Sequence, residues 1–328
     1  MAMIAAMDVV GNPSSVHAEG RKARALLEKA RAQVAAALGA DGAEIVFTSG
    51  ATEAAGLALK GRGLSGAAVE HDAVRAWCND TLEVDSLGAV RLPNPGRATL
   101  QMANSETGIV QALPEGLAVS DLTQGFGKLP FAFNWLGVEM GFVSAHKIGG
   151  PKGVGALVMR RGTDIAAQIR GGGQEMGRRA GTENLIAIAG FGAAAQAAAK
   201  DLADGVWNSV SEIRNILEQA LDAGASKTIL VGKEAERLPN TLCLATPGWK
   251  GETQVMQMDL AGFAISAGSA CSSGKLRASA VLGAMGFDAA TASGAIRVSL
   301  GVQTQEEDAL RFVDAWLKEY RRFAARAA

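Results

Sequence analysis

The sequence predicts an α/β protein with a mostly parallel sheet, helices on both faces of the sheet, and a smaller α+β region at the C-terminus. Short apolar runs alternate with helical patterns through the first two hundred or so residues, which is typical of parallel strands joined by helices. Polar residues follow several of these runs, at the strand ends where such sheets bind ligands. A composition break at Asp204–Gly205 predicts a large domain at 11–203 and a small domain at 204–328.

Composition excludes several classes of protein. Lys and Arg number 32 against 33 Asp and Glu, so bulk charge gives no reason to expect direct nucleic-acid binding. No apolar run of about 18 residues predicts a membrane span, and no secretory signal is apparent. The cysteines at 78, 243 and 271 lack metal-ligand spacing, so we expect no metal site and a cytoplasmic location.

The first elements predict an anion site. Apolar residues recur every three or four positions over 16–38, which predicts a helix with His17 at its start as a cap or surface residue. A short strand at 44–47, a turn at 49–52 and a helix at 52–60 follow. The free N–H groups of that helix start, with the Ala51 backbone and the Thr52 hydroxyl, suit a phosphate. The alternative is that Thr52 only caps the helix.

Three further predicted strands end in polar residues. His71 follows a short apolar run and precedes a helix that Asp72 is expected to cap, and it is either a ligand-site residue or a structural histidine. A strand at 98–103 ends at Asn104, and a strand at 117–120 leads into Asp121 and Gln124. These side chains are expected to meet at one edge of the sheet.

Residues 142–159 form two apolar, strand-like runs joined by a polar link that holds Ser144, His146 and Lys147. A lysine at a buried sheet end is costly unless it is neutralised or covalently used. A desolvated lysine beside hydroxyl and imidazole groups suits Schiff-base chemistry with an aldehyde cofactor. The alternative is a surface hairpin with an exposed lysine. The nearby GPKGVG (150–155) lacks the ending of a P-loop, and GVGALV (153–158) lacks the third glycine of a dinucleotide fingerprint.

The rest of the chain adds a second possible anion site, at a helix start, and a candidate reactive cysteine. A glycine- and arginine-rich loop at 169–182 precedes a helix at 183–202, with Thr182 as the expected N-cap. Helix 206–223 and strands at 228–231, 241–245, 263–266 and 295–300 precede a last helix from 305, opened by a capping box at Thr304–Glu307. Cys271 lies in AGSACSSGKLRAS (267–279), which predicts a mobile loop. Lys275 and Arg277 favour its thiolate, so Cys271 is either a nucleophile or incidental.

Seven motifs, in order and in spacing, together resemble the cysteine desulfurases of the class V aminotransferase group, which are fold-type I pyridoxal 5′-phosphate (PLP) enzymes with a seven-stranded-type sheet. The motifs are TSGATE (48–53), ANSETG (103–108), DLTQGFGK (121–128), SAHKIGGPKGVGAL (144–157), GGGQEMGRRAGTEN (171–184), GSACSSG (268–274) and IRVSLG (296–301). The serine- and glycine-rich stretch around Cys271 resembles the long-loop group that serves nitrogen fixation and iron–sulfur assembly.

The resemblance implies a role for each candidate residue. Lys147 would hold PLP covalently, Asp121 would sit at the pyridine nitrogen, and His71 would stack on the ring and move protons. Gln124 would bond the phenolic oxygen. The phosphate would lie among Ala51, Thr52, Ser144, His146 and, from the partner subunit of a homodimer, Thr182. Asn104 and Arg297 would hold the substrate carboxylate.

The implied reaction is L-cysteine to L-alanine, with the sulfur left as a persulfide on Cys271. The sulfur would pass to an acceptor such as an iron–sulfur scaffold protein, for cluster assembly or tRNA thiolation, and Cys271 is a candidate transient cluster ligand. Alternatives are another class V enzyme, either an aminotransferase or a selenocysteine lyase, and a weakly catalytic sulfur-relay subunit.

The sequence departs from the family pattern at three points. A segment that usually precedes GNPSSVH is not found before Gly11, so either the true start lies upstream or residues 1–10 are a shortened N-terminal segment. The link from 108 to the Asp121 strand leaves no room for the usual crossover helix. Lys275 and Arg277 replace smaller or acidic residues, which predicts altered partner docking.

Overall fold

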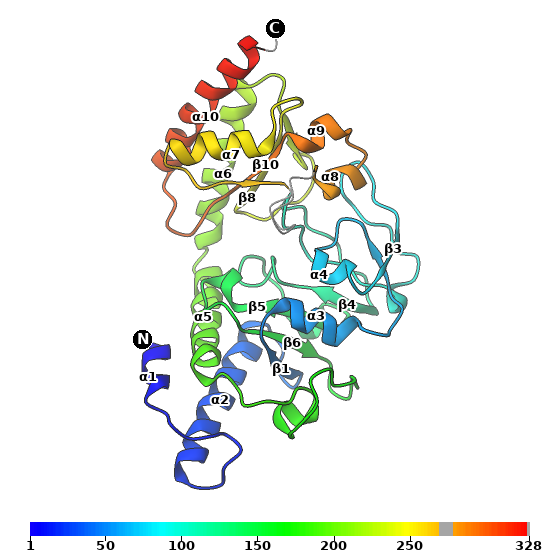
Figure 1. Ribbon diagram of the computed structural model, residues 1–328, viewed down its shortest axis with the longest axis vertical. Helices are drawn as coiled ribbons and strands as arrows, with labels where there is room; N and C mark the ends of the chain where they lie inside the picture. Colours follow the sequence, from blue (N-terminus) through cyan, green and yellow to red (C-terminus); the bar gives the residue numbers. More distant parts are fainter. Residues whose placement is uncertain (269–277, 327–328) are drawn as a thin grey trace.

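The computed structural model describes residues 1–268 and 278–326, and there it has the predicted α/β architecture (Figure 1). The expectations for Cys271, Lys275 and Arg277 lie outside the described residues. The chain forms a lower region around one sheet and an upper region around a second sheet. Helices α5 (Leu185–Ala203) and α6 (Val206–Gly224) run along one side and connect the two.

The lower sheet has the strand order β1 (Glu44–Thr48), β6 (Gly155–Met159), β5 (Val138–Ser144), β4 (Leu117–Asp121). Parallel bridges from Val119 to Thr99 and from Ala98 to Ser65 extend it to the parallel pair β2 (Ser65–Ala67) and β3 (Asn79–Leu82). The described residues therefore place seven strand positions side by side, and β6 runs against the others. The strand predicted at 98–103 is present as these bridges and not as a continuous ladder.

Helices cover both faces of this sheet, as predicted. Side chains alternate along β1, so Ile45 and Phe47 pack into the cluster with α2 (Ala18–Ala37) and α5, while Val46 packs with α3 (Ala51–Leu59). By length and composition α5 is apolar enough to cross a membrane. In the fold it packs against α2 and against α1 (Ala2–Met7), a short helix that the sequence did not predict. We therefore read α5 as a core helix.

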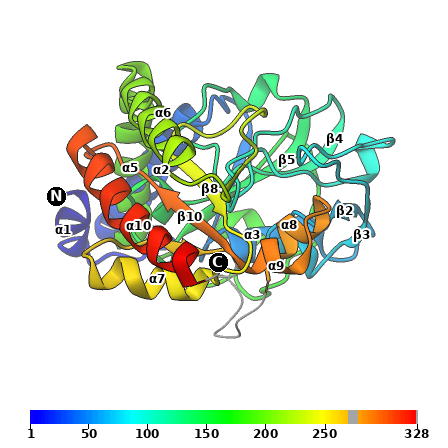
Figure 2. The ribbon, with the colours of Figure 1, turned by 90° about the horizontal axis from the view of Figure 1, so that it is seen from above.

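The upper region is antiparallel and α+β. Its sheet has the order β7 (Ile229–Val231), β8 (Thr241–Ala245), β10 (Ala295–Ser299), β9 (Ser266–Ala267). Helices α6, α7 (Gly251–Leu260) and α10 (Glu306–Arg326) gather beside β8 and β10 (Figure 2). Two short helices, α8 (Ala280–Ala284) and α9 (Ala289–Ser293), follow the residues that are not described. A separate apolar cluster that includes Trp249 and Trp316 fills this region.

The caps predicted at Thr182, Asp72 and Thr304 are wrong, and the cap predicted at His17 is confirmed. Asn184, not Thr182, caps α5 by accepting a bond from Ala187 N at 3.2 Å, because the chain turns helical only at Leu185. His71, not Asp72, caps the short helix α4 (Asp72–Arg75). The Thr304 hydroxyl accepts from Gly301 N and forms no capping box, since α10 begins two residues later. His17 caps α2, as one of the two predicted alternatives had it.

A buried ion pair fixes the 171–182 loop on the sheet. Glu175, whose side chain is 1% exposed, takes a left-handed φ of 48°. It accepts two bonds from Arg31, at 2.8 and 2.9 Å, and one from Phe47 N at 2.8 Å. Non-glycine residues adopt such a φ only when their surroundings impose it. The side chain bonds of Glu175 thus set the path of the loop.

We expect Glu175→Ala to lower the free energy of unfolding by about 3–5 kcal/mol, because it removes both bonds from the largely buried Arg31 guanidinium and leaves the buried Phe47 N–H without its acceptor. Urea denaturation measures the change. Glu28 pairs with the same guanidinium at the exposed surface, so Glu28→Ala is the matched control and should cost at most about 1 kcal/mol. Equal losses in the two variants would contradict the account.

Candidate active site

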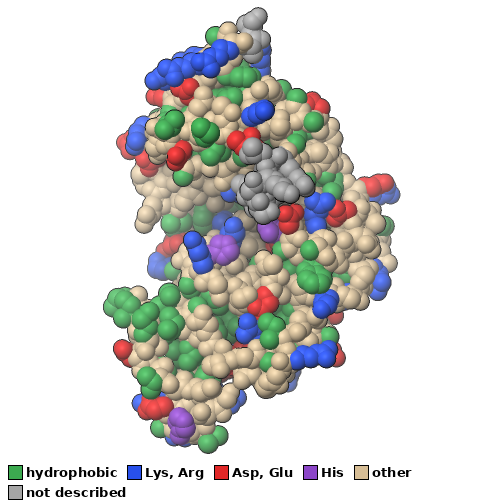
Figure 3. All heavy atoms as spheres, in the orientation of Figure 1, with side chains coloured by type: hydrophobic (Ala, Val, Ile, Leu, Met, Phe, Trp, Pro, Cys, Tyr) green, Lys and Arg blue, Asp and Glu red, His purple; other side chains and the backbone are tan. Residues whose placement is uncertain are grey.

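One cavity collects most of the predicted site residues. It has a volume of about 510 Å³, which suits a small cofactor with a substrate. It lies where β4, β5 and the start of α3 meet, and Arg297 of β10 closes it from the upper region. Figure 3 shows the molecule hollowed between its two regions, with histidine and basic side chains at the wall. The predicted residues that line it are Ala51, Thr52, His71, Asp121, Gln124, Ser144, His146, Lys147 and Arg297.

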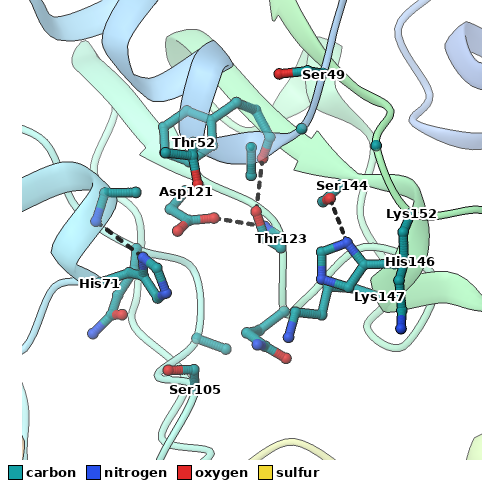
Figure 4. Close-up of a pocket in the computed structure, with 18 of the residues that line it drawn as sticks. Ser49, Thr52, His71, Ser105, Asp121, Thr123, Ser144, His146, Lys147 and Lys152 are labelled. Atoms are coloured by element: carbon teal, nitrogen blue, oxygen red, sulfur yellow. Dashed lines mark hydrogen bonds between the residues drawn. The ribbon is translucent and has the colours of Figure 1, made fainter. Parts of the chain in front are cut away.

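Lys147 and His146 come directly after β5, on the short 3₁₀ turn Ala145–Ile148. The strands β5 and β6 do form a hairpin and Lys147 is exposed, as the alternative had it, and not desolvated as predicted. Both side chains nevertheless line the cavity (Figure 4). The Ser144 hydroxyl and His146 Nδ1 lie 2.8 Å apart. Burial, with the charges of Lys147 and Lys152, lowers the pKa of His146, so this ring is a neutral hydrogen-bonding group beside a cationic wall.

The start of α3 is open to a ligand. Its N-cap is Gly50, which offers no side chain, and Thr52 is the second helical residue. The alternative in which Thr52 caps the helix is therefore wrong. Gly155 lets β6 approach this turn, because a Cβ there would lie 2.8 Å from the Gly50 backbone. The uncapped helix start faces the cavity beside Ser144, an arrangement that suits an anion.

Asp121 ends β4 inside the cavity. One carboxylate oxygen accepts a bond from Thr123 N at 2.8 Å. Burial raises the pKa of this carboxyl, while the bond from Thr123 and the positive charges of His71 and Lys147 oppose the rise. A protonated nitrogen of a ligand at this oxygen would stabilise the carboxylate further.

His71 faces Lys147 across the cavity (Figure 4). Its Nδ1 accepts a bond from Ala73 N at 3.0 Å, which fixes the ring and leaves Nε2 to carry the exchangeable proton. Gln124 also lines the cavity, and its backbone carbonyl accepts a bond from Lys128 at 2.9 Å. Burial, together with the charge of Lys147, lowers the pKa of Lys128 to about 8.

The two residues predicted to hold a carboxylate are placed differently. Arg297 lines the cavity, bonds Ser105 O at 2.7 Å and the Ser266 hydroxyl, and has a buried Nε with no partner. Asn104 is 3% exposed and is not part of the cavity wall. Its amide donates to Val69 O and accepts from the backbone of the 104–108 turn. The structure therefore brings its neighbour Ser105 to the wall instead.

A family model for class-V aminotransferases matches residues 3–76 and 66–312 of the chain. The chain belongs to this family. Its relatives include the cysteine desulfurase IscS of Dictyoglomus turgidum, 36% identical over 91% of this chain and 84% of that protein, and a cysteine desulfurase of Klebsiella pneumoniae, 38% identical over 92% and 83%. A NifS-like protein from Rickettsia africae superposes with a TM-score of 0.88, at 30% identity, over 97% of this chain and 94% of that one. Within the class-V family, the chain therefore falls in the cysteine desulfurase group.

Thr182, which was predicted to contact the cofactor phosphate, does not line the main cavity. Thr182 is exposed and lines a second cavity of about 230 Å³, with Arg179, Asn184 and the back of the Ser49 turn. The predicted contact of Thr182 with a cofactor in another subunit stays a prediction.

Sequence reasoning missed several residues of the cavity wall. Thr123 and Ser105 stand beside predicted strand-end residues, so the strand-end rule applied to whole turns would have found them. Lys152 lies in the glycine-rich link between β5 and β6, and only the hairpin geometry brings it back to the wall. The missed residues are Ser49, Gly50, Ala73, Gln101, Ala103, Ser105, Thr123, Phe142, Lys152 and Gly153.

A buried acid behind the cavity also escaped the sequence reasoning. Glu70 is 3% exposed and accepts a bond from Gln101 N at 2.6 Å, and its other oxygen has no partner. Burial, and then the charge of Asp121, raise the pKa of Glu70 to about 8. Glu70 is therefore mostly neutral in the folded protein at neutral pH.

The Glu70 shift predicts a pH dependence of stability. The folded protein keeps a proton that the unfolded chain releases near pH 4.5, so stability falls as the pH rises from there to about 8. Glu70→Gln mimics the neutral acid and should lack this loss, which we expect to be on the order of 3 kcal/mol at pH 8. Urea midpoints at pH 5, 6.5 and 8 measure it, and parallel curves for the two proteins would refute it.

Proposed function

We propose that this chain is a PLP-dependent cysteine desulfurase that converts L-cysteine to L-alanine and takes the sulfur on Cys271. The observation that supports it best is the shared cavity of Lys147, Asp121 and the uncapped start of α3. Each of these groups suits one part of PLP: Lys147 suits the aldehyde, Asp121 the ring nitrogen and the helix start the phosphate. The relatives named cysteine desulfurase give the substrate class.

The residues present fit PLP. Lys147 would hold the aldehyde carbon, Asp121 the ring nitrogen and Gln124 the phenolic oxygen, with His71 against the ring. The phosphate would lie at Ala51 and Thr52, next to Ser144 and His146. PLP, when bound, withdraws electrons from the carbon that carries the substrate amino group.

The side chains of the chain itself would do the rest. Arg297 lines the cavity and would hold the substrate carboxylate through two N–H groups. The Lys147 amine would take the proton from the substrate α-carbon. The His71 ring lies across the cavity from Lys147 and would be the second group that moves protons. The Cys271 thiolate would bond to the substrate sulfur while the carbon–sulfur bond breaks. The released carbon would take up a proton, which yields alanine and a persulfide.

The assembly and the sulfur acceptor follow from the same proposal. We infer a homodimer in which Thr182, at its separate cavity, reaches the cofactor phosphate of the partner subunit. We also infer a large domain at 11–203 and a small one at 204–328, of the long-loop group. A cytoplasmic iron–sulfur scaffold protein, or an enzyme of tRNA thiolation, would receive the sulfur.

The test is product analysis with purified protein, added PLP, L-cysteine and a thiol reductant. We expect alanine and sulfide in equal amounts. An aminotransferase would instead need a 2-oxo acid and release no sulfide, and a selenocysteine lyase would turn over selenocysteine but not cysteine. Absence of both products from protein that binds PLP would refute the proposal.

A further inference from the structure

Glu106 is a half-buried acid, next to the wall residue Ser105, to which the mechanism above gives no role. It belongs to the turn after the 98–103 segment, where its N–H donates to Asn104 Oδ1 at 2.8 Å. Its side chain leaves the lower region and reaches the upper one. There its Oε2 accepts a bond of 2.6 Å from the Ser279 hydroxyl, 173 positions along the chain.

Glu106 meets both ends of the segment that carries Cys271. Gly268 is the last described residue before that segment, and a Cβ on it would lie 3.3 Å from Glu106 Oε2 and 3.1 Å from Ser279 Cβ. Gly268 N donates to Ala295 O, and Ser279 N donates to Ala292 O. The two ends thus lie side by side, and Glu106, from the lower region, lies against both.

Ser279 couples this contact to a helix. It is 2% exposed and caps α8, since its hydroxyl oxygen also accepts from Leu282 N at 3.1 Å. A bond from its hydroxyl to a charged carboxylate holds the hydroxyl oxygen toward that N–H. The carboxylate therefore orders the start of α8 as well as the ends of the segment.

We propose that Glu106 is a positioning residue for sulfur transfer: it fixes Gly268 and Ser279, the two ends of the segment that carries Cys271, to the cavity that holds the substrate. The inference rests on the proposed function. Glu106 does not touch the reacting atoms, so its loss should slow the step that needs Cys271 and spare the step that needs Lys147.

Charged groups on all sides tune this carboxyl. Burial raises the pKa of Glu106 to about 7; Asp72 raises it further, while Ser279, Arg297 and His71 oppose the rise. Cys243, on β8, is buried, and burial together with the charge of Glu106 raises the pKa of its thiol, which stays neutral. The bond to Ser279 should be stronger above pH 7, where Glu106 is ionised.

The test compares Glu106→Gln and Glu106→Ala in the PLP-loaded enzyme during a single turnover with L-cysteine. We expect the absorbance change on substrate binding at the wild-type rate, and persulfide formation about tenfold slower in Glu106→Ala, the scale of one hydrogen bond to a charged group. Glu106→Gln keeps an acceptor oxygen, so its rate of persulfide formation should lie between those of the wild type and Glu106→Ala. The rate of persulfide formation in the wild type, divided by the rate in Glu106→Gln, should rise as the pH passes 7. Because Cys271 ionises in both proteins, its own pH dependence drops out of this ratio.

The control is Asp288→Ala, which removes the N-cap of the neighbouring helix α9 and should leave both rates unchanged. Wild-type rates in both Glu106 variants, or equal slowing of both steps, would overturn the inference. A second readout needs no catalysis: peptide-resolved alkylation of Cys271 by iodoacetamide. A changed rate in Glu106→Ala supports the inference and an unchanged rate contradicts it, even if the wild-type protein forms no persulfide and the proposed function fails.

Discussion

Lys147→Ala is expected to lower alanine formation from cysteine by at least about 10³-fold, since it removes both the covalent hold on PLP and the base that moves the α-proton. The fold should survive, because the Lys147 side chain is exposed at the cavity wall and lies outside the apolar clusters. The rate of alanine formation at saturating PLP measures the loss. The absorbance of bound PLP should change as well, because no lysine links it.

Lys152 supplies the matched control. It is also an exposed lysine on the cavity wall, five positions further along the chain, so Lys152→Ala removes an equal charge from the same surface. We expect this variant to lose only phosphate attraction, and to keep the alanine rate within about tenfold when PLP is saturating. Comparable losses in the two variants would mean that charge, and not covalent chemistry, makes Lys147 necessary.

Cys271→Ser is expected to abolish sulfide release from cysteine, at least about 10³-fold below wild type, because a hydroxyl does not attack a substrate thiol at neutral pH. Substrate binding should still change the absorbance of PLP, since Lys147 and Arg297 remain. Sulfide release and the absorbance change, followed on the same sample, separate the two steps. A variant that releases sulfide normally would point to one of the alternative class V activities.

The described cysteines are poor substitutes for Cys271. Burial, followed by the charges of Glu70 and Asp80, raises the pKa of Cys78 to about 11. Burial also raises the pKa of Cys243, inside β8. Both stay protonated at neutral pH, so Cys78→Ser is the control variant and should keep wild-type sulfide release.

Much of the site could be predicted because parallel strands end at one edge. His71, Asp121, Gln124 and Lys147 each follow an apolar run, and a parallel sheet leaves such residues few places other than a shared cavity. Asn104 also follows a predicted strand but does not line the cavity, because its side-chain oxygen accepts bonds from Glu106 N and Thr107 N of its own turn. A rule about strand ends places a residue; local hydrogen bonds decide which way its side chain points.

Contacts between distant parts of the chain could not be predicted. Nothing local marks Glu175 as the partner of Arg31, or Glu106 as the acceptor for Ser279, since each pair depends on the complete fold. The same holds for Glu70, whose raised pKa comes from burial among three separate segments. Helix caps failed for a smaller reason: the first helical residue shifted by one or two positions, which transfers the cap to another side chain.

The most direct test is the mass of the peptide that carries Cys271, after PLP-loaded protein is mixed with L-cysteine without reductant. We predict one added sulfur on that peptide, released by a thiol, together with one alanine per modified chain. In Lys147→Ala the peptide should stay unmodified. Alanine formed with Cys271 unmodified, or added sulfur on Cys271 in Lys147→Ala, would contradict the pairing of Lys147 with Cys271.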